Sequence, residues 1–385
     1  MKIKAICALL AAALVLCLSA SAETADYSVY ANTVLDTAQL AAKYFVGLAD
    51  STRLLGKCTQ GSEAYSLIYE FSKWHSVAAA RGRFENLEVS DYATEGDGRF
   101  SCRVTGDFVC SYYTRDDAPF ALDYKLYFEL EREKIKLYDI SLLPKDAERI
   151  RTDIETDEDG ITLYLLRRKT YKAYVMTVED PSRLYVGVTN VNFSGVGKKL
   201  ERLIEQYGAI GGINGCGFED PNGKGNGGNP LGLVIADGQL LRRANPMYAV
   251  VGFDADNVLR TGYMTSDEAV ALGLRDAVSW GPPLIIDGKA QPITRDPTGL
   301  NPRSVIGQAA DGSIMLVTVE GRRPDSPGAS YEDLVSLMAD LGAVTACNLD
   351  GGPSSAMYLN GKLINGVEPL TAKRGIPCAI LIKGR

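Results

Sequence analysis

The sequence predicts an α+β protein built in two parts. The first part, residues 23–145, has apolar residues at helical spacing and then apolar and polar residues in alternation, which indicates helices followed by an antiparallel sheet. The second part, residues 161–385, indicates a mixed α/β domain with an extensive sheet. Its strand-like runs are separated by dipeptides typical of two-residue hairpin turns, namely Asp237-Gly238, Asp287-Gly288, Asp311-Gly312 and Asn360-Gly361. A turn-rich, acidic stretch at residues 146–160 is expected to be the junction between two domains.

Composition and charge exclude several classes of function. The 385 residues carry 41 Lys and Arg against 48 Asp and Glu, a formal charge of −7, which argues against a protein that binds nucleic-acid backbones. His75 is the single histidine, so His-rich metal sites are excluded. We expect no metal and no cofactor.

The first 22 residues have the features of a signal peptide. Lys2 and Lys4 precede an apolar run from Ala5 to Leu18, and Ala20-Ser21-Ala22 provides small residues for cleavage. The run is shorter than the ~20 residues of a membrane-spanning helix, and no second such run follows. We therefore expect a secreted protein without a membrane span. A lipoprotein attached through Cys17 is a weaker alternative, because Leu14-Val15-Leu16 lacks small residues.

The six cysteines beyond the signal peptide show no disulfide framework. Cys102 and Cys110 share one face of an alternating stretch, and on one straight strand they would lie too far apart to be bridged. Only a hairpin at Gly106 would pair them. Buried thiols are the favoured interpretation.

In the first part, helical spacing is seen near Val34–Phe45 and Leu67–Trp74, and strands are expected over Phe100–Tyr113 and Phe120–Leu142. Helices followed by a long antiparallel sheet are loosely similar to the cone-shaped nuclear-transport-factor-2-like domains. His75, on the apolar side of a helix, is expected to be a core residue.

In the second part, two predicted helices each lead into a strand that ends in a polar loop. The helix at about 196–207 precedes Asn214-Gly215-Cys216-Gly217-Phe218, and the helix capped by Ser330 precedes Asp350-Gly351-Gly352-Pro353-Ser354-Ser355. Polar groups just beyond strand ends are where α/β sheets place their sites. These two loops are therefore the predicted site.

Three familiar motifs do not fit the second part. The glycine-rich run 223–228 opens no helix and lacks the Lys-Ser/Thr ending of a phosphate-binding loop. The stretch from Asp220 begins like a calcium loop but has Lys224 and Leu231 at ligand positions. Ser354 resembles a nucleophile elbow, yet the single histidine lies in the other part of the chain.

Residues 160–385 resemble the phosphodiester glycosidase family. The resemblance rests on an ordered set of motifs, listed in chain order: Gly212-Ile213-Asn214-Gly215 with Phe218, Gly281-Pro282-Pro283-Leu284, Pro302-Arg303-Ser304-Val305-Ile306-Gly307, Val317-Thr318-Val319-Glu320-Gly321-Arg322 and Asn348-Leu349-Asp350-Gly351-Gly352-Pro353-Ser354-Ser355. Pro353 stands where the family commonly has glycine, and Glu320 where it commonly has aspartate. The resemblance implies hydrolysis of the bond between a sugar and a phosphodiester.

The chemistry of such a reaction assigns roles to these residues. Cleavage develops positive charge on the sugar and releases a phosphate, so carboxylates are expected near C1 and cations near the phosphate. Glu320 and Asp350 are the predicted catalytic pair, with their individual roles open. The predicted substrate-binding groups are the guanidinium groups of Arg303 and Arg374 for phosphate, Asn214 for the sugar, and the backbone N–H groups of Gly351, Gly352, Ser354 and Ser355 for an oxyanion.

Each role has a structural alternative. Glu320 would pair with Arg322 or Arg323 on the surface, Asp350 would cap a helix that starts at Ser354, and Arg374 would be an ordinary surface cation. At the level of function, the sequence predicts a secreted hydrolase of glycosyl phosphodiesters in envelope or extracellular glycans. The alternative is a non-catalytic protein that binds glycans or has a structural role in the envelope.

Overall fold

The computed structural model describes residues 26–72, 79, 81–112, 115–142, 150–151, 160–221, 225–244, 247–294, 296, 298–366 and 374–385. The predicted signal peptide, His75 and most of the predicted acidic junction lie outside these residues. In the part of the chain that the structure describes, no helix combines the length and the apolar character that a membrane span requires.

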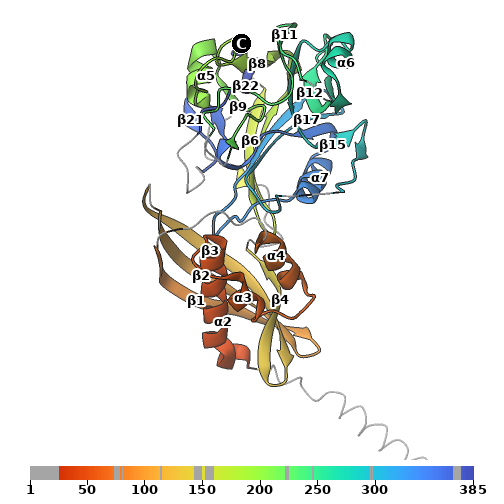
Figure 1. Ribbon diagram of the computed structural model, residues 1–385. Coiled ribbons are helices and arrows are strands. Elements are labelled where there is room, and N and C mark those ends of the chain that lie inside the picture. The colour runs from red at the N-terminus through yellow and green to blue at the C-terminus, as the bar shows by residue number, and fades with distance from the viewer. Residues whose placement is uncertain are drawn as a thin grey trace, which may run out of the picture.

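The N-terminal part has helices packed on a four-stranded antiparallel sheet (Figure 1). The sheet has the order β1-β2-β3-β4. The bounds are η1 Tyr27–Tyr30, α2 Ala31–Phe45, α3 Ser51–Leu55, α4 Glu63–Ser72, β1 Arg81–Gly96, β2 Arg99–Tyr112, β3 Arg115–Glu131 and β4 Lys134–Ser141. The predicted order of helices and then strands is confirmed, except that a turn at Arg132 and Glu133 divides the second expected strand into β3 and β4.

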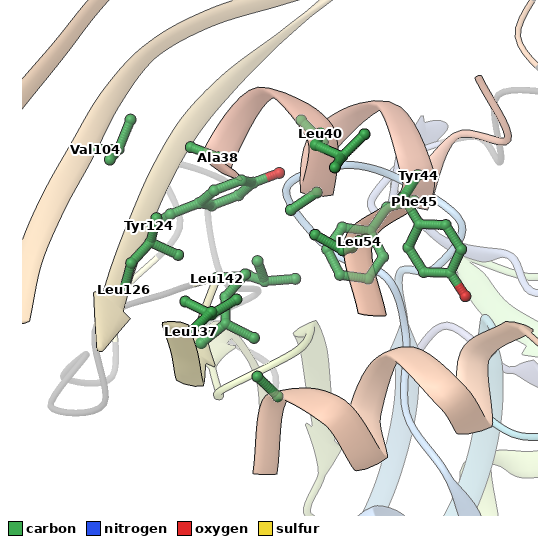
Figure 2. Close-up of a cluster of buried hydrophobic side chains, with 14 of the residues drawn as sticks. Ala38, Leu40, Tyr44, Phe45, Leu54, Val104, Tyr124, Leu126, Leu137 and Leu142 are labelled. Atoms are coloured by element: carbon green, nitrogen blue, oxygen red, sulfur yellow. The ribbon is translucent and has the colours of Figure 1, made fainter. Parts of the chain in front are cut away.

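Alternation along the strands produces the core of this part. On β3, Tyr124, Leu126 and Phe128 are buried, while the residues between them are exposed or half-buried. Figure 2 shows Tyr124 and Leu126 among the buried side chains of this core. Cys102 and Cys110 lie on the buried face of β2, with Gly106 inside the same strand. The favoured interpretation of buried free thiols is therefore confirmed for these two cysteines, and no hairpin forms at Gly106.

The C-terminal part contains three antiparallel sheets (Figure 1). Their strand orders are β16-β15-β19-β17-β18-β7-β6-β5, β21-β20-β9-β22-β8 and β11-β10-β14-β12-β13. The bounds are β5 Ile150–Arg151, β6 Ile161–Arg167, β7 Lys172–Val178, β8 Leu184–Val188, β9 Gly211–Asn214, β10 Val234–Ala236, β11 Gln239–Arg242, β12 Tyr248–Phe253, β13 Leu259–Met264, β14 Asp276–Trp280, β15 Pro283–Ile286, β16 Lys289–Ala290, β17 Arg303–Ala309, β18 Ile314–Val319, β19 Ala343–Asn348, β20 Met357–Leu359, β21 Lys362–Leu363 and β22 Cys378–Ile382. The predicted mixed architecture with an extensive sheet is confirmed.

Local turn chemistry explains the hairpins of these sheets. Asp237-Gly238, Asp287-Gly288 and Asn360-Gly361 have positive φ at both residues, as a type I′ turn requires, and each joins two paired strands. At Asp311-Gly312 only the glycine has positive φ, so β17 and β18 are joined by a longer turn.

Helices and short 3-10 turns accompany the sheets, and those with described bounds are η2 Pro181–Arg183, α5 Leu200–Tyr207, α6 Ser266–Ala271, α7 Tyr331–Asp340 and η4 Gly352–Ser354. Ser330 and Asp333 form a capping box at the start of α7, and Gly208 ends α5 with φ 62°. The strands β9 and β19 follow α5 and α7, as predicted. The helix α6 was not predicted.

Candidate functional site

The polar loops that follow β9 and β19 meet although the two strands belong to different sheets. The backbone N–H of Asp350 donates to the carbonyl of Gly215 at 3.2 Å, and Nδ2 of Asn214 donates to the carbonyl of Asp350 at 2.7 Å. Oδ1 of Asn214 accepts from Oγ of Ser304 at 2.7 Å and from the N–H of Ala356 at 3.2 Å. Asn214 is fully buried, so it ties the two loops together. The expected contact of Asn214 with a sugar does not fit this position.

A pocket of about 380 Å³, which we call the Asp350 pocket, opens where the loops meet. It combines guanidinium groups, aromatic rings and carboxylates in one cavity. Its lining residues are Phe218, Asp220, Trp280, Thr298, Asn301, Arg303, Arg322, Tyr331, Asp350, Gly351, Gly352, Pro353, Ser354 and Arg374. A larger cavity, about 560 Å³ between α4 and α7, contains none of the residues predicted for the site.

Asp350 is the half-buried carboxyl group of this pocket. Burial raises its pKa to about 7, because desolvation outweighs the hydrogen bonds from Ser354 and from the N–H of Gly351 and the positive charge of Arg374. The following 3-10 turn, η4, has Gly351 as its N-cap and no side-chain cap. The alternative in which Asp350 caps a helix is therefore not observed.

Arg303 is the first residue of β17 and is 4% exposed. Its Nε donates to the carbonyl of Ala329 at 3.0 Å, and its Nη2 donates to the carbonyl of Gly299 at 2.6 Å and to Oγ1 of Thr298 at 2.9 Å. The guanidinium lies 4.2 Å from the ring centroid of Tyr331. Nη2 also pairs with the carboxylate of Asp296 at 3.4 Å. The guanidinium is therefore held in place by the protein at the wall of the pocket that it lines.

Arg374 and Asp220 form an ion pair in the pocket. Both guanidinium Nη atoms donate to the carboxylate of Asp220, Nη2 also donates to the carbonyl of Gly225 at 2.6 Å, and the guanidinium lies 4.8 Å from the ring centroid of Phe218. This hydrogen bonding lowers the pKa of Asp220. The Arg374 side chain is only 16% exposed, so it is part of the pocket and not an ordinary surface cation.

Glu320 lies outside the Asp350 pocket. Its Oε1 accepts from the N–H of Gly366 at 2.6 Å and pairs with Nη1 of Arg323 at 3.0 Å, and its side chain is 2% exposed. Oε2 has no hydrogen-bond partner among the described residues and borders a separate cavity of about 10 Å³ with Ser355. Gly352 lines both cavities. The structure therefore does not bring Glu320 and Asp350 into one pocket, and the pairing with Arg323 that the sequence allowed is present but buried.

The backbone N–H groups predicted for an oxyanion are already used. The N–H of Gly351 donates to Oδ1 of Asp350 at 3.0 Å, and that of Gly352 donates to the carbonyl of Pro302 at 2.9 Å. The N–H groups of Ser354 and Ser355 donate to the carbonyls of Gly351 and Gly352 within the 3-10 turn, at 3.2 and 3.1 Å. This prediction is corrected: the 3-10 turn satisfies the N–H groups of Ser354 and Ser355, and Asp350 and Pro302 accept from those of Gly351 and Gly352.

Several pocket residues were not predicted as site residues. Arg322 is held by Oδ1 of Asn301, which accepts from its Nε at 3.1 Å and its Nη2 at 2.9 Å. Trp280 and Tyr331 add aromatic faces, and Asp220 adds the second carboxylate. Arg322 ends one family motif and Trp280 directly precedes another, which was the available signal. Nothing in the sequence indicated Tyr331.

A disulfide lies directly next to these loops. It joins Cys216, two residues before Phe218, to Cys378 at the start of β22. It therefore fixes the loop after β9 to the start of β22, four residues after Arg374. Among the residues that the structure describes, no group of three His, Cys, Asp or Glu side chains is arranged to hold a metal ion.

Comparison with known proteins gives the following matches. Residues 207–383 match the family model described as phosphodiester glycosidase, which confirms the resemblance. The chain is 30% identical over 200 residues to the SPbeta prophage-derived uncharacterized protein YomE of Bacillus subtilis, covering 49% of this chain and 29% of that protein. It is 24% identical over 216 residues to the mouse N-acetylglucosamine-1-phosphodiester alpha-N-acetylglucosaminidase, covering 49% of this chain and 40% of the enzyme. The chain thus spans less than half the length of these relatives.

Among solved structures, the catalytic domain of the zebrafish N-acetylglucosamine-1-phosphodiester alpha-N-acetylglucosaminidase, auto-inhibited by its pro-peptide, is similar at 17% identity and a TM-score of 0.48. The match covers 85% of this chain and 94% of that one.

Proposed function

Because residues 207–383 match the phosphodiester glycosidase family, we propose that this protein hydrolyses glycosyl phosphodiesters at the Asp350 pocket. The bond that breaks lies between C1 of the sugar and the phosphate oxygen. Water adds at C1, and the phosphate leaves as a monoester. The protein acts outside the cytoplasm on envelope or extracellular glycans, a location that suits the predicted signal peptide and the Cys216–Cys378 disulfide.

One observation carries the proposal: a single pocket presents arginine side chains, aromatic rings and a carboxyl group with a raised pKa. The phosphodiester carries one negative charge, which a guanidinium can bind through a charge-assisted hydrogen bond. The apolar faces of a sugar ring can pack on Phe218, Trp280 or Tyr331. A site of this composition suits a ligand that is a sugar at one end and a phosphate at the other.

Asp350 is assigned to proton transfer. With a pKa of about 7 it is protonated in about half of the molecules at neutral pH, so it can donate a proton to the departing phosphate oxygen and recover one from the attacking water. Asp220 stays ionised because Arg374 lowers its pKa, so it can stabilise positive charge on the sugar. Two carboxyl groups with pKa values shifted in opposite directions are typical of acid–base pairs in hydrolases.

Glu320 is assigned a supporting role. Its carboxylate is already paired with Arg323 and bonded to the N–H of Gly366, and it does not line the Asp350 pocket. We therefore assign the role of second carboxylate of the site to Asp220 and not to Glu320.

The experiment that tests the proposal uses a panel of sugar-1-phosphodiesters. The purified mature chain is incubated with each compound, and the free reducing sugar is measured, with Asp350→Asn as the matched control. We expect release from at least one phosphodiester by the parent and a loss of several orders of magnitude in the variant. Binding of the compounds without release would support the non-catalytic glycan-binding alternative.

A further inference from the structure

We propose that strand β3 of the N-terminal sheet positions one wall of the Asp350 pocket, and that it does so through the 320–327 segment. Tyr124 and Phe120 contact Pro324 and Arg323 of this segment, and the neighbouring Arg322 lines the pocket. This inference gives residues 27–142 a role that the phosphodiester glycosidase match, which begins at residue 207, does not cover. Its kinetic consequence rests on the proposed function, whereas its structural consequence does not.

The contact between β3 and the segment is buried and specific. The hydroxyl of Tyr124 donates to the carbonyl of Pro324 at 2.9 Å, and Tyr124 is fully buried. The guanidinium of Arg323 lies 5.1 Å from the ring centroid of Phe120, which is 6% exposed. Loss of its acceptor costs a buried hydroxyl more free energy than it costs an exposed one, because water cannot replace the acceptor. These contacts therefore hold Pro324 and Arg323 in one position.

The segment is closed on itself, so its two ends move together. Arg323 and Ser326 exchange two backbone hydrogen bonds, each of 3.2 Å, and the N–H of Arg322 donates to the carbonyl of Pro327 at 2.8 Å. The hydroxyl of Ser326 donates to the carbonyl of Glu320 at 2.9 Å. A displacement at Pro324 is therefore transmitted to Arg322 instead of being absorbed between them.

Buried charges strengthen the segment. Arg323 pairs with Glu320 at 3.0 Å and with Asp325 at 3.0 Å, and Asp325 pairs with Lys172 of β7. Two positive and two negative groups thus compensate each other. Because the ring of Phe120 lies against the guanidinium of Arg323, displacing it would let water reach the ion pairs and weaken them.

Residues 321 and 322 of the segment lie next to the pocket. A Cβ atom added at Gly321 would lie 2.3 Å from the backbone nitrogen of Pro302, which shows how closely these two parts of the backbone approach. Oδ1 of Asn301 accepts from both Nε and Nη2 of Arg322. Asn301 and Arg322 both line the pocket. The position of the Arg322 guanidinium therefore depends on the contact between Pro324 and Tyr124.

The test compares two tyrosine variants that delete the same kind of bond. Tyr124→Phe removes the hydrogen bond to Pro324. Tyr44→Phe removes a buried hydrogen bond of 2.8 Å from the hydroxyl of Tyr44 to the carbonyl of Ile68, inside the N-terminal core. Both changes should lower thermal stability to a similar degree, so stability serves as the common reference.

Two measurements distinguish positioning from a purely structural role. Amide hydrogen exchange of residues 320–327 should become faster in Tyr124→Phe and stay unchanged in Tyr44→Phe. With an active sugar phosphodiester, KM should rise about three- to tenfold in Tyr124→Phe, with kcat within about twofold. In an Arg322→Ala background, Tyr124→Phe should no longer change KM, because the effect passes through Arg322.

Unchanged exchange in the 320–327 segment of Tyr124→Phe would overturn the inference, as would an equal KM change in both tyrosine variants. If the parent releases no sugar from any phosphodiester, the proposed function fails while the exchange measurement still decides this inference. If Tyr124→Phe does not fold, Phe120→Leu replaces it, since leucine keeps an apolar side chain and removes the ring beneath Arg323. The same faster exchange is then expected.

Discussion

Replacing Asp350 by asparagine should make the protein more stable at alkaline pH, although it removes the group assigned to proton transfer. The raised pKa of Asp350 means that the folded protein holds the neutral carboxyl group better than the charged one. Asparagine is neutral at every pH and has nearly the same shape. Its side-chain oxygen can still accept from the N–H of Gly351.

The magnitude follows from the two pKa values. The pKa of Asp350 is raised from the ordinary value of 3.8 to about 7. At 1.36 kcal/mol for each pKa unit, ionising Asp350 in the folded protein costs about 4 kcal/mol of unfolding free energy. The sign is that of a raised pKa: the folded chain binds the proton more tightly than the unfolded chain. The contribution of protonated Asp350 to the unfolding free energy is therefore fully present below pH 3.8, declines as the pH rises and is lost above about pH 7.

The assay is urea unfolding of the parent and of Asp350→Asn at pH 4 and pH 8. We expect similar stabilities at pH 4, apart from the effect of the substitution itself, and a variant more stable by up to about 4 kcal/mol at pH 8. Asp254→Asn is the matched control of opposite sign. Burial raises the pKa of Asp254, but hydrogen bonds from the N–H groups of Val258 and Asp256 and from Arg260 outweigh burial, so the pKa lies below its ordinary value. This variant should therefore be less stable than the parent at pH 8.

An Asp350→Asn variant that is less stable than the parent at pH 8, or a difference that does not change between the two pH values, would refute the reasoning. The first result would mean that the surroundings stabilise the carboxylate of Asp350, and the second that its pKa is the same in the folded and unfolded protein. Asp350 would then be ionised at neutral pH and unable to donate a proton to the phosphate.

Three further predictions concern the same site. In the parent, kcat/KM for an active phosphodiester should decline above about pH 7 as Asp350 loses its proton, and a profile flat to pH 9 would contradict its role as proton donor. Glu320→Gln should lower the unfolding free energy by about 3–5 kcal/mol, because it leaves the buried Arg323 with less compensating charge. It should reduce turnover less than Asp350→Asn, and abolished turnover with parental stability would instead place Glu320 in the chemistry. Arg303→Lys should raise KM more for a phosphodiester than for an aryl glycoside of the same sugar, because it weakens phosphodiester binding by about 1–3 kcal/mol. An equal rise in KM for both substrates would exclude phosphate binding by Arg303.

Local chemistry allowed part of the structure to be predicted from the sequence. Asp-Gly and Asn-Gly pairs adopt positive φ with little strain, so three hairpin turns could be located without any tertiary information. Ser330 and Asp333 identified the start of α7, because a capping box also depends only on residues close in the sequence. The polar loops after β9 and β19 were recognised because polar residues ended apolar strands, and these loops do meet.

Long-range packing determined what the sequence could not show. Cys216 and Cys378 are 162 residues apart, and no spacing rule pairs them. Asp220 lines the pocket as the ion-pair partner of Arg374, which lies 154 residues away in the sequence. Glu320 is held by Arg323 and by the N–H of Gly366. The sequence motif around Glu320 could not show whether its carboxylate enters the Asp350 pocket or lies beside it.

Burial and the surrounding hydrogen-bond donors together explain why the pKa values of the two pocket carboxylates differ: desolvation raises that of Asp350, whereas the hydrogen bonds from Arg374 lower that of Asp220. Arg374 directs both Nη atoms to Asp220, which keeps that carboxylate charged. Asn214 donates to the main-chain carbonyl of Asp350 and leaves the carboxyl group alone, so it fixes the position of Asp350 without stabilising its charge. Moving one guanidinium from Asp220 to Asp350 would lower the pKa of Asp350 and remove the proton that the reaction needs. The tie through Asn214 therefore allows the pocket to hold a rigid carboxyl group that is still protonated near neutral pH.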